Sequence, residues 1–493
     1  MPSAPRPRPR KLGTSADDKG VRISNPSGHH PTSSHCEYSH NREFSLGRLV
    51  VSKLSGSETD LDDCITNLKP RVLTKTSQSH LIHHPQSKRP RLSPPEKNSP
   101  KMPPKAPKPN GTFTYCVGSN PPFTPEEYAS DPTRRQRALD HLAKNDLYAA
   151  TVVTFNLPER DTYVYHAMTA VRLAEVQRVV SMGGVNGLHA WYRDEEGKPL
   201  DPPPQADIQS YIQIFSPKTS TPQALKSHLA NAKKSSLRFL SASHLLANRY
   251  IHPSLPNLDA IPKCKNPQTS LPPNPSLDFW SWSALSLQYA GPLPSQPLQS
   301  HHVLPILMHH FGCATPSHEA LSILRLLAFG RAIADIGSGN GYWTHMLRLY
   351  NLTVYPVDNL QSEWRTNWVS DTIPSDGVSF LKSHEGGKDM VMLLVYPVVG
   401  GSVAGGTEGS FTRGLVEAYK GDTIAVVGTQ NGNGYTGFRG MTMAEYMARE
   451  QPEWIKVVQI SLPSFAGKDE ALFVFQRGKR APPRDEGVAA KDA

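Results

Sequence analysis

The sequence predicts an α/β fold near the C-terminus, preceded by a mainly helical accessory region and by a disordered N-terminal tail. First, short apolar runs alternate with stretches of helical spacing between residues 318 and 478, as in chains that alternate strands and helices. Second, residues 111–250 carry repeated helix-start signals. Third, residues 1–110 mix Pro, Ser, His and Lys without any sustained periodicity.

The N-terminal tail holds the basic character of the chain. Residues 1–110 contain 19 basic and 9 acidic residues, an excess that equals the net charge of +10 of all 493 residues. With so few aliphatic residues, the tail cannot bury enough surface to offset the entropy of ordering. The rest of the chain is balanced in charge and gives no global electrostatic reason to bind nucleic acid, so that partner is left open.

Within the tail, Lys88, Arg89, Pro90 and Arg91 precede Ser93-Pro94. This pattern is typical of a short nuclear-import signal beside a proline-directed phosphorylation site, although basic clusters are also common in tails that bind nothing. A nuclear-import receptor is therefore one candidate partner.

The cysteines and apolar runs indicate an intracellular protein without a metal site or a membrane span. The five cysteines include no CxxC pair and no close pairing with histidines, so neither a zinc site nor a disulfide framework is expected. The longest apolar stretch, residues 390–399, is about half of the ~20 residues that span a bilayer. The N-terminus has no apolar core for a secretory signal. We expect the protein in the cytoplasm or the nucleus.

The accessory region is expected over residues 111–250. Thr124-Pro125 followed by two glutamates has the pattern of a capping box. Further along, residues 148–157 are β-branched and aromatic, as in a strand, and Asp161 then precedes helical spacing up to Gly183. Thr221-Pro222 begins another helical stretch that runs to about Arg249, with a break near residues 233–234.

Residues 251–300 are predicted to be a proline-rich linker that carries three large aromatics, Phe279, Trp280 and Trp282. Aromatics in a linker usually pack on something. Packing on a neighbouring helix is favoured over a lid above a substrate pocket.

The segment with the clearest chemistry begins the domain expected over residues 301–480, which is followed by a disordered C-terminal tail over residues 481–493. A helix that starts near Thr315-Pro316 ends at Gly330, and residues 332–336 form a short apolar run that contains Asp335. Three glycines follow at once, and then helical spacing resumes. Glycines are needed where a turn tightens and its backbone approaches a ligand. The following helix N-terminus favours an anionic group.

The spacing of this turn is D-x-G-x-G-x-G, with Tyr342 where the nicotinamide fingerprint has its third glycine. It resembles motif I of the class I S-adenosylmethionine-dependent methyltransferases. The chain as a whole also resembles uncharacterised fungal proteins with an ADIGSGNGYW-type motif. The first resemblance implies a Rossmann-like, seven-stranded methyltransferase sheet with S-adenosyl-L-methionine as its cofactor.

Later segments follow the same family in order. Residues 390–395 resemble the fourth strand, residues 423–428 the fifth, and residues 454–460 with 471–476 the closing antiparallel pair. Two features depart from the pattern. Pro356 lies in what should be an interior strand, where it removes a ladder hydrogen bond, and the glycine-rich residues 400–409 replace a compact helix.

The resemblance implies a role for each matching residue. Asp335 is expected at the methionine moiety, Asp358 at the ribose and Asp371 at the adenine amino group. The cradle under the cofactor is expected from Gly337, Ser338, Gly339 and Gly341. The alternative is that the glycines only make a tight turn and the acids only cap helices.

The predicted reaction is methyl transfer to an oxygen or nitrogen acceptor, which could be a small molecule, a protein or RNA. Residues 396–399 are not the Asp/Asn-Pro-Pro-Tyr/Phe motif of adenine methylation, and no cysteine after Cys313 could attack a pyrimidine. No general base is identified. Trp343 could cover the sulfonium, but a place in the core is favoured. Candidate pocket residues are Tyr396, Gln430, Asn431, Asn433 and Tyr435, because ligands lie at strand carboxyl ends.

Two other functions compete with this one. The domain could bind the cofactor without catalysis, as an interaction or regulatory protein. It could also be an NAD(P)-dependent oxidoreductase, which Tyr342 disfavours.

Overall fold

The computed structural model describes residues 123–167, 170–183, 191–293, 301–397, 407–431, 437–438 and 440–484. The predicted tail, its basic cluster at Lys88 to Arg91, and residues 485–493 lie outside this part of the chain. So do Asn433, Tyr435 and most of the predicted loop at 400–409.

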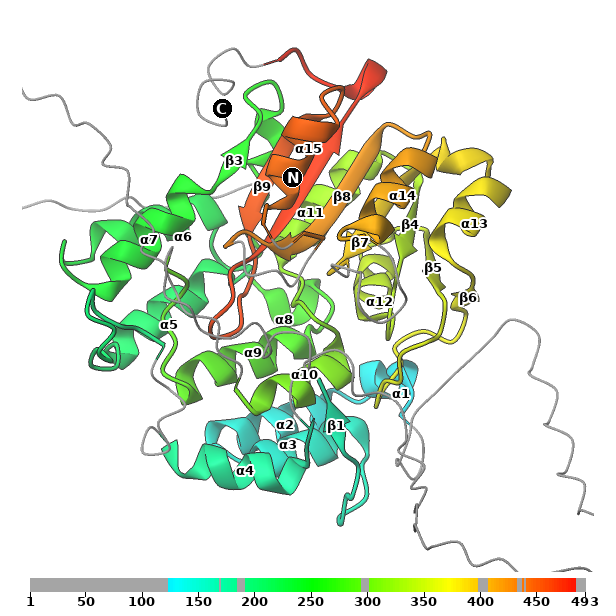
Figure 1. Ribbon diagram of the computed structural model, residues 1–493. Coiled ribbons are helices and arrows are strands. Elements are labelled where there is room, and N and C mark those ends of the chain that lie inside the picture. Colours follow the sequence, from blue (N-terminus) through cyan, green and yellow to red (C-terminus); the bar gives the residue numbers. More distant parts are fainter. Residues whose placement is uncertain are drawn as a thin grey trace, which may run out of the picture. The chain divides into compact units, whose positions relative to one another are not determined.

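The structure contains an eight-stranded, mostly parallel sheet, and seven of its strands come from residues 332–476 (Figure 1). Its spatial order is β3-β9-β10-β8-β7-β4-β5-β6. The strands from β4 to β8 run parallel to one another, and β9 and β10 form the expected antiparallel pair, with β10 next to β8. The bounds are β3 Tyr250–Ile251, β4 Ala332–Ile336, β5 Val354–Asp358, β6 Ile373–Pro374, β7 Met390–Val395, β8 Thr423–Thr429, β9 Ile455–Ser461 and β10 Glu470–Gln476.

Helices cover both faces of the sheet because its strands are apolar on both sides. Ala334 and Ile336 point to one face and pack with α13 (Gly377–Ser383), α14 (Ser410–Ala418) and α15 (Met443–Glu450). Ile333 points to the other face, which is covered by α11 (His318–Ala328) and α12 (Tyr342–Leu349). The result is a three-layer arrangement that is compatible with a Rossmann-like fold.

The helices before β4 share a core with the α11 and α12 face. A single cluster of buried side chains joins Trp280 and Phe311 to Ile333 and Trp343. The other helices are α1 Pro125–Ser130, α2 Pro132–Ala143, α3 Leu147–Phe155, α4 Leu173–Ser181, α5 Gln205–Ile214, α6 Thr221–Ala230, α7 Leu237–Ala247, α8 Pro267–Ser270, α9 Pro275–Ser286 and α10 Val303–Phe311. The accessory region is therefore packed on the sheet domain rather than attached by a free linker.

Helix α9 contains the three aromatics of the predicted linker. Phe279, Trp280 and Trp282 are all buried, and the Trp280 indole N–H donates to the Ser464 carbonyl at 2.9 Å. The interpretation that they pack on neighbouring structure is confirmed.

The predicted strand at residues 148–157 is wrong, because these residues form α3. Asp146 caps this helix by accepting from the Ala149 amide at 2.9 Å. The Thr151 and Thr154 hydroxyls donate to carbonyls four residues earlier. Burial of the whole helix outweighs the β-propensity of its residues.

The predicted helix after Asp161 is also wrong in its first half. Strands β1 (Tyr165–His166) and β2 (Ala170–Val171) pair antiparallel there, and α4 begins only at Leu173. Asp161 does not cap a helix: its carboxylate pairs with Arg365 at 2.7 Å, and both side chains are buried. A long-range ion pair thus fixes a segment whose local pattern is helical.

The sheet has eight strands where the resemblance implied seven. The extra strand, β3, lies at the boundary between the expected helical region and the expected linker, and pairs antiparallel with β9 through Tyr250 and Gln459. Pro356 does not interrupt its strand, since it keeps its register opposite Asp335. Its missing N–H falls before the first β5–β6 pair, Val357 with Ile373, where no strand needs it.

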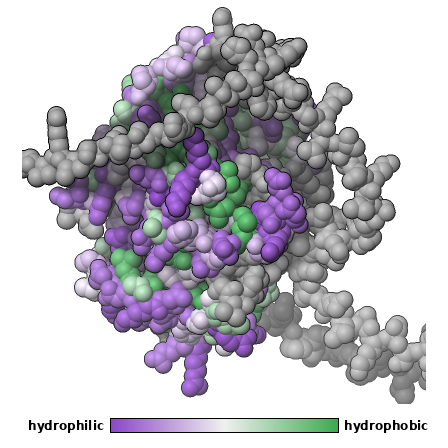
Figure 2. Space-filling model, turned by 90° about the vertical axis from the view of Figure 1, so that its left-hand side faces the viewer, coloured by the Kyte–Doolittle hydropathy of each residue, from purple (hydrophilic) through white to green (hydrophobic). Residues whose placement is uncertain are grey.

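Hydrophobic residues on the described surface are scattered. On the face shown in Figure 2, small hydrophobic areas are separated by hydrophilic side chains. Among the described residues, Phe329 is the most exposed large hydrophobic residue, at 78%. Isolated residues of this kind do not indicate an interface. Within the same part of the chain, no helix is both long enough and apolar enough to span a bilayer.

Candidate functional site

The strand order places Asp335, the glycine loop, Asp358 and Tyr396 at neighbouring strand ends of the sheet. Strand β4 lies between β5, which follows it in the chain, and β7, which comes later. The order therefore reverses between β4 and β7, and ligands of open α/β sheets bind outside the carboxyl ends of the strands at such a switch point. The glycine loop, residues 337–341, leaves the end of β4 there, and Tyr396 leaves the end of β7.

The glycine loop is a turn that only glycine makes easily. Gly337, Gly339 and Gly341 have φ values of 75°, 57° and 75°, in the left-handed region. A Cβ on Gly341 would lie 2.3 Å from the Val369 side chain, and one on Gly339 would lie 3.0 Å from the Trp364 ring. Both conformation and space thus require glycine in this loop.

Strand β5 holds the glycine loop in place. The amides of Gly337 and Ser338 both donate to the Val357 carbonyl, at 2.8 and 3.1 Å. The Ser338 hydroxyl and the Asn340 side-chain amide are buried and have no hydrogen-bond partner among the described residues. The loop therefore retains hydrogen-bonding groups that its own fold does not use.

Asp335 lies fully buried beneath the glycine loop. The Thr344 hydroxyl donates to its Oδ2 at 2.7 Å, and its Oδ1 accepts from no described residue. Burial raises the pKa of Asp335 to about 7, and the negative charge of Asp358 adds to the rise. A carboxyl group with this pKa is half protonated near pH 7.

Asp358 joins the glycine loop to the end of β5. Its Oδ2 accepts from the Gly339 amide at 2.9 Å and its Oδ1 from the Leu360 amide at 2.7 Å. Burial raises the pKa of Asp358, and these two backbone bonds oppose the rise. A carboxylate has about four acceptor positions, so two remain for a ligand.

Asp371 is not brought to the glycine loop. It forms a bidentate pair with Arg348, at 2.8 and 2.7 Å, near the end of α12 that is distant from the loop. This pairing lowers the pKa of Asp371. Its expected contact with adenine stays a prediction.

The acceptor-pocket candidates differ in their surroundings. Tyr396 has a φ of 57°, which is strained for a residue with a side chain and is often found at functional sites. Gln430 is committed to structure, because its side chain donates to Asp469 at 2.8 Å and accepts from Gln459 at 3.0 Å. Asn431 Oδ1 is buried without a described partner.

Two aromatic residues of α12 belong to the core. The Trp343 indole N–H donates to the Ala314 carbonyl at 2.9 Å, so the interpretation of Trp343 as a core residue is confirmed. The Tyr342 hydroxyl donates to Asn274 at 2.8 Å and accepts from the Ser276 amide at 3.1 Å. Tyr342 therefore anchors the start of α9 and faces away from the loop.

Sequence analysis missed Trp364, Lys468 and Glu470. Trp364 lies against Gly339, in the segment after Asp358, where a tryptophan among polar residues was the available signal. Glu470 is the first residue of β10, Lys468 stands two residues before it, and both are buried. The sequence feature that could have indicated them is the run of three consecutive charged residues where an apolar strand begins.

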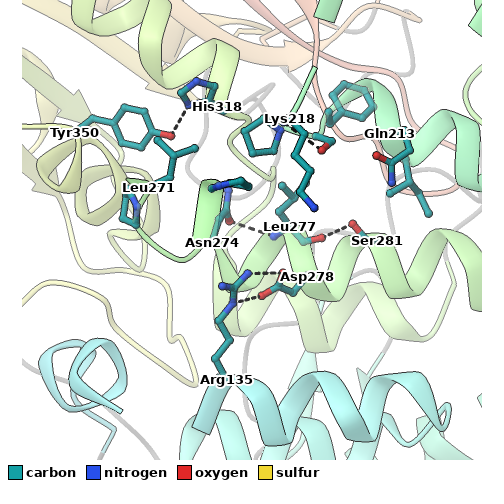
Figure 3. Close-up of a pocket in the computed structure, with 16 residues that line it drawn as sticks. Arg135, Gln213, Lys218, Leu271, Asn274, Leu277, Asp278, Ser281, His318 and Tyr350 are labelled. Atoms are coloured by element: carbon teal, nitrogen blue, oxygen red, sulfur yellow. Dashed lines mark hydrogen bonds and ion pairs between the residues drawn. The ribbon is translucent and has the colours of Figure 1, made fainter. Parts of the chain in front are cut away.

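A separate cavity of about 260 Å³ lies among the accessory helices and the ends of α11 and α12 (Figure 3). Arg135 and Asp278 form a bidentate pair in its wall, at 2.8 and 3.0 Å, and His318 bonds to the Tyr350 hydroxyl at 2.8 Å. Tyr350 follows the end of α12 opposite the glycine loop. None of the predicted site residues lines this cavity, so its size does not make it the candidate site.

The described residues contain no group of three or more His, Cys, Asp or Glu side chains that could hold a metal ion. Of the five cysteines, Cys264 and Cys313 lie in the described ranges and are free thiols.

No protein-family description matches the chain, and no curated protein sequence does. Among solved structures, an uncharacterised protein (LMOf2365_1472) from Listeria monocytogenes serotype 4b is similar over 34% of this chain and 71% of its own, at 12% identity and a TM-score of 0.23. Magnesium protoporphyrin IX methyltransferase (ChlM) from Synechocystis PCC 6803, with bound SAM, is similar over 37% of this chain and 87% of its own, at 10% identity and a TM-score of 0.24. Likenesses at these scores carry no argument about function.

Proposed function

We propose that this chain is an S-adenosylmethionine-dependent methyltransferase that acts on an oxygen or nitrogen of its acceptor. The position of the glycine loop carries the proposal. Its D-x-G-x-G-x-G turn, with three left-handed glycines, stands at the switch point of the sheet, where a nucleoside-containing ligand is expected.

The residues at this point fit S-adenosylmethionine. Asp358 keeps two acceptor positions for the ribose hydroxyls. Ser338 and Asn340 offer buried polar groups that the fold leaves unpaired within the described ranges. The Trp364 ring beside Gly339 offers a flat face on which adenosine can pack.

When bound, the cofactor supplies a methyl group on a positively charged sulfur. The protein must then align the acceptor with this group and exclude water, since alignment supplies most of the rate enhancement in such a transfer. Tyr396 follows the end of β7, beside the end of β4, which supports a position for it on the acceptor side.

The oxidoreductase alternative is not favoured by the environment of Tyr342. The third glycine of a nicotinamide fingerprint permits close packing of helix on strand. Here the Tyr342 side chain fills that position and bonds to Asn274. The non-catalytic alternative has one observation in its favour: Asp358 already bonds to two backbone amides and could serve only the turn.

Calorimetric titration of the full-length chain with S-adenosylmethionine, S-adenosylhomocysteine and NAD tests the proposal. We expect micromolar binding of the first two, weakened at least about tenfold by Asp358→Ala, because two hydrogen bonds to the ribose are each worth about 1 kcal/mol. Transfer of a labelled methyl group then distinguishes an enzyme from a binding protein. Binding of NAD alone would overturn the proposal.

A further inference from the structure

A cluster of buried charges stands at the start of β10. Lys468, Asp469 and Glu470 are consecutive, and each side chain is at most 3% exposed. Glu470 begins the row of side chains that Leu472 and Val474 continue into the core on the α11 and α12 face. Buried charges are costly unless they are paired or used.

The register of the sheet places this cluster beside the switch point. Glu470 is opposite Thr429, the last residue of β8, and β8 lies next to β7, at whose end Tyr396 stands. The Lys468 ammonium is 4.8 Å from the centre of the Tyr396 ring. The cluster thus occupies the side of β7 that faces away from Asp358.

A second path links the cluster to the glycine loop. A Cβ on Gly312 would lie 3.4 Å from the Asn340 side-chain oxygen, so the turn after α10 touches the loop. The next residue, Cys313, interacts electrostatically with both Lys468 and Glu470. The turn after α10 therefore lies between the glycine loop and the charge cluster.

Asp469 and Glu470 differ in how their carboxylates are bonded. Asp469 accepts from Gln430 at 2.8 Å and bonds to His244 at 2.6 Å. Neither oxygen of Glu470 accepts a hydrogen bond of good geometry within the described residues, although the Ser464 hydroxyl lies close enough to lower the pKa of this carboxyl. The nearby Ser464 hydroxyl donates its proton to the Leu462 carbonyl and accepts from the Glu470 amide. Glu470 is thus the carboxylate that the fold leaves available.

We propose that Glu470, with Lys468 and Tyr396 beside it, forms the methyl-acceptor site and takes the proton that the acceptor releases. The inference rests on the proposed function. A lone pair of the acceptor nitrogen or oxygen forms the bond to the methyl carbon, and the carbon–sulfur bond breaks with its electron pair staying on sulfur. The proton of the acceptor N–H or O–H passes to a Glu470 oxygen, which leaves the acceptor neutral in this step.

The proposal narrows the acceptor class. The acceptor carries a hydrogen on nitrogen or oxygen, as amines, imidazoles, amides and hydroxyl compounds do. An acceptor that is already a carboxylate has no proton to give and meets the negative charge of Glu470.

The surroundings of Glu470 suit a base that works near neutral pH. Burial raises the pKa of Glu470 to about 7, against the positive charge of Lys468. The other titratable groups that face it are Asp469, Cys313, Tyr211 and Tyr289. A base is most effective when its pKa lies near the working pH.

Carboxyl labelling of the full-length chain tests whether Glu470 lines a site. A water-soluble carbodiimide with glycine ethyl ester converts reachable carboxyls to amides, which peptide mass spectrometry locates. Glu319 is the control: it is slightly more exposed than Glu470, at 4% against 0%, but pairs with Arg249 at 2.7 Å, so exposure alone would make Glu319 the faster to react. We expect Glu470 to react at least ten times faster than Glu319 and to stay reactive up to about pH 7. Equal rates at the two residues overturn the proposal.

Repeating the labelling with saturating S-adenosylhomocysteine separates this proposal from the proposed function. We expect the rate at Glu470 to stay within twofold, because the acceptor site remains open beside the sulfur. Protection of Glu470 by this ligand would assign it to the cofactor site and overturn the proposal. Glu470→Gln should bind S-adenosylhomocysteine within twofold of the wild type. If the wild type does not bind S-adenosylhomocysteine, the proposed function is wrong, whereas the labelling result for Glu470 remains valid.

Discussion

Two regions of this protein could be taken for its binding site, and they differ in how their polar groups are used. The cavity of Figure 3 has a volume of about 260 Å³. Four of its polar side chains are bonded in pairs: Arg135 with Asp278, and His318 with Tyr350. These bonds join α2 to α9 and α11 to the end of α12. The cavity wall is polar because it holds helices together.

At the carboxyl ends of the strands the opposite holds. Asp335 Oδ1, the Ser338 hydroxyl, the Asn340 amide and both oxygens of Glu470 are buried without partners within the described residues. Most buried polar groups in proteins are hydrogen-bonded, so unpaired ones at the place where a ligand is expected need a reason. The comparison teaches that unused hydrogen-bonding capacity indicates a site better than volume does.

The largest effect is expected at the glycine loop. Gly339→Asp introduces a side chain at φ 57°, against Trp364, and adds a negative charge beside the ligand. We expect the affinity for S-adenosylmethionine to fall at least about 100-fold, or about 2.7 kcal/mol. Gly330→Asp is the matched control: it has a φ of 80° and nothing within 4 Å of an added Cβ. Both should lose about 1–2 kcal/mol of stability from backbone strain. If calorimetry gives the two variants equal affinities for the cofactor, the glycine loop is not part of the binding site.

The next effect separates the two regions directly. Asp278→Ala breaks the pair that lines the cavity and leaves Arg135 half-buried without it, so the free energy of unfolding should drop by about 1–3 kcal/mol. Cofactor affinity should not change, whereas Asp358→Ala should lower that affinity about tenfold or more. Urea unfolding and calorimetry on both variants give the two quantities. A loss of cofactor affinity in Asp278→Ala would make the cavity part of the site.

Titration of Asp335 should make the stability of the protein depend on pH. Its pKa is raised to about 7 in the folded chain, against about 4 when unfolded, so the folded state holds the extra proton between these values. The stability of the wild type should therefore fall as pH rises from about 4 to 7. Asp335→Asn cannot lose a proton, so its stability should gain on that of the wild type across the same range. Denaturant titrations at several pH values measure this difference, and parallel curves would show that Asp335 does not titrate there.

The sequence predicts the sheet well because its signals are local. Apolar runs, glycine turns and helix spacing locate β4, α12 and β7 without knowledge of their neighbours. Before β4, the predicted secondary structure is wrong where contacts with residues distant in the sequence determine it. The residues around Asp161 predict that it caps a helix. In the structure it pairs instead with Arg365, which lies about two hundred residues away in the chain. Burial against other helices likewise turns the β-prone residues of α3 into a helix.

The same reason explains which site residues were foreseen. The glycine loop and Asp358 follow from a contiguous motif. Lys468 and Glu470 come near the end of β7 only because β10 inserts between β8 and β9, which is a property of strand order. Adjacent charges in a strand did not reveal by themselves which one the fold would leave unpaired.

The smallest effect is expected at Asp371, and it tests a residue that the family pattern and the structure treat differently. The pattern assigns Asp371 to the adenine amino group, whereas in the structure both its oxygens bond to Arg348 at a largely exposed position. Exposed pairs contribute about 0–1 kcal/mol. Asp371→Asn should therefore leave the cofactor affinity within about twofold and cost less than about 1 kcal/mol of stability. A tenfold loss of affinity in the calorimeter would mean that the segment after β5 rearranges when the ligand binds, releasing Asp371 from Arg348 to reach the adenine.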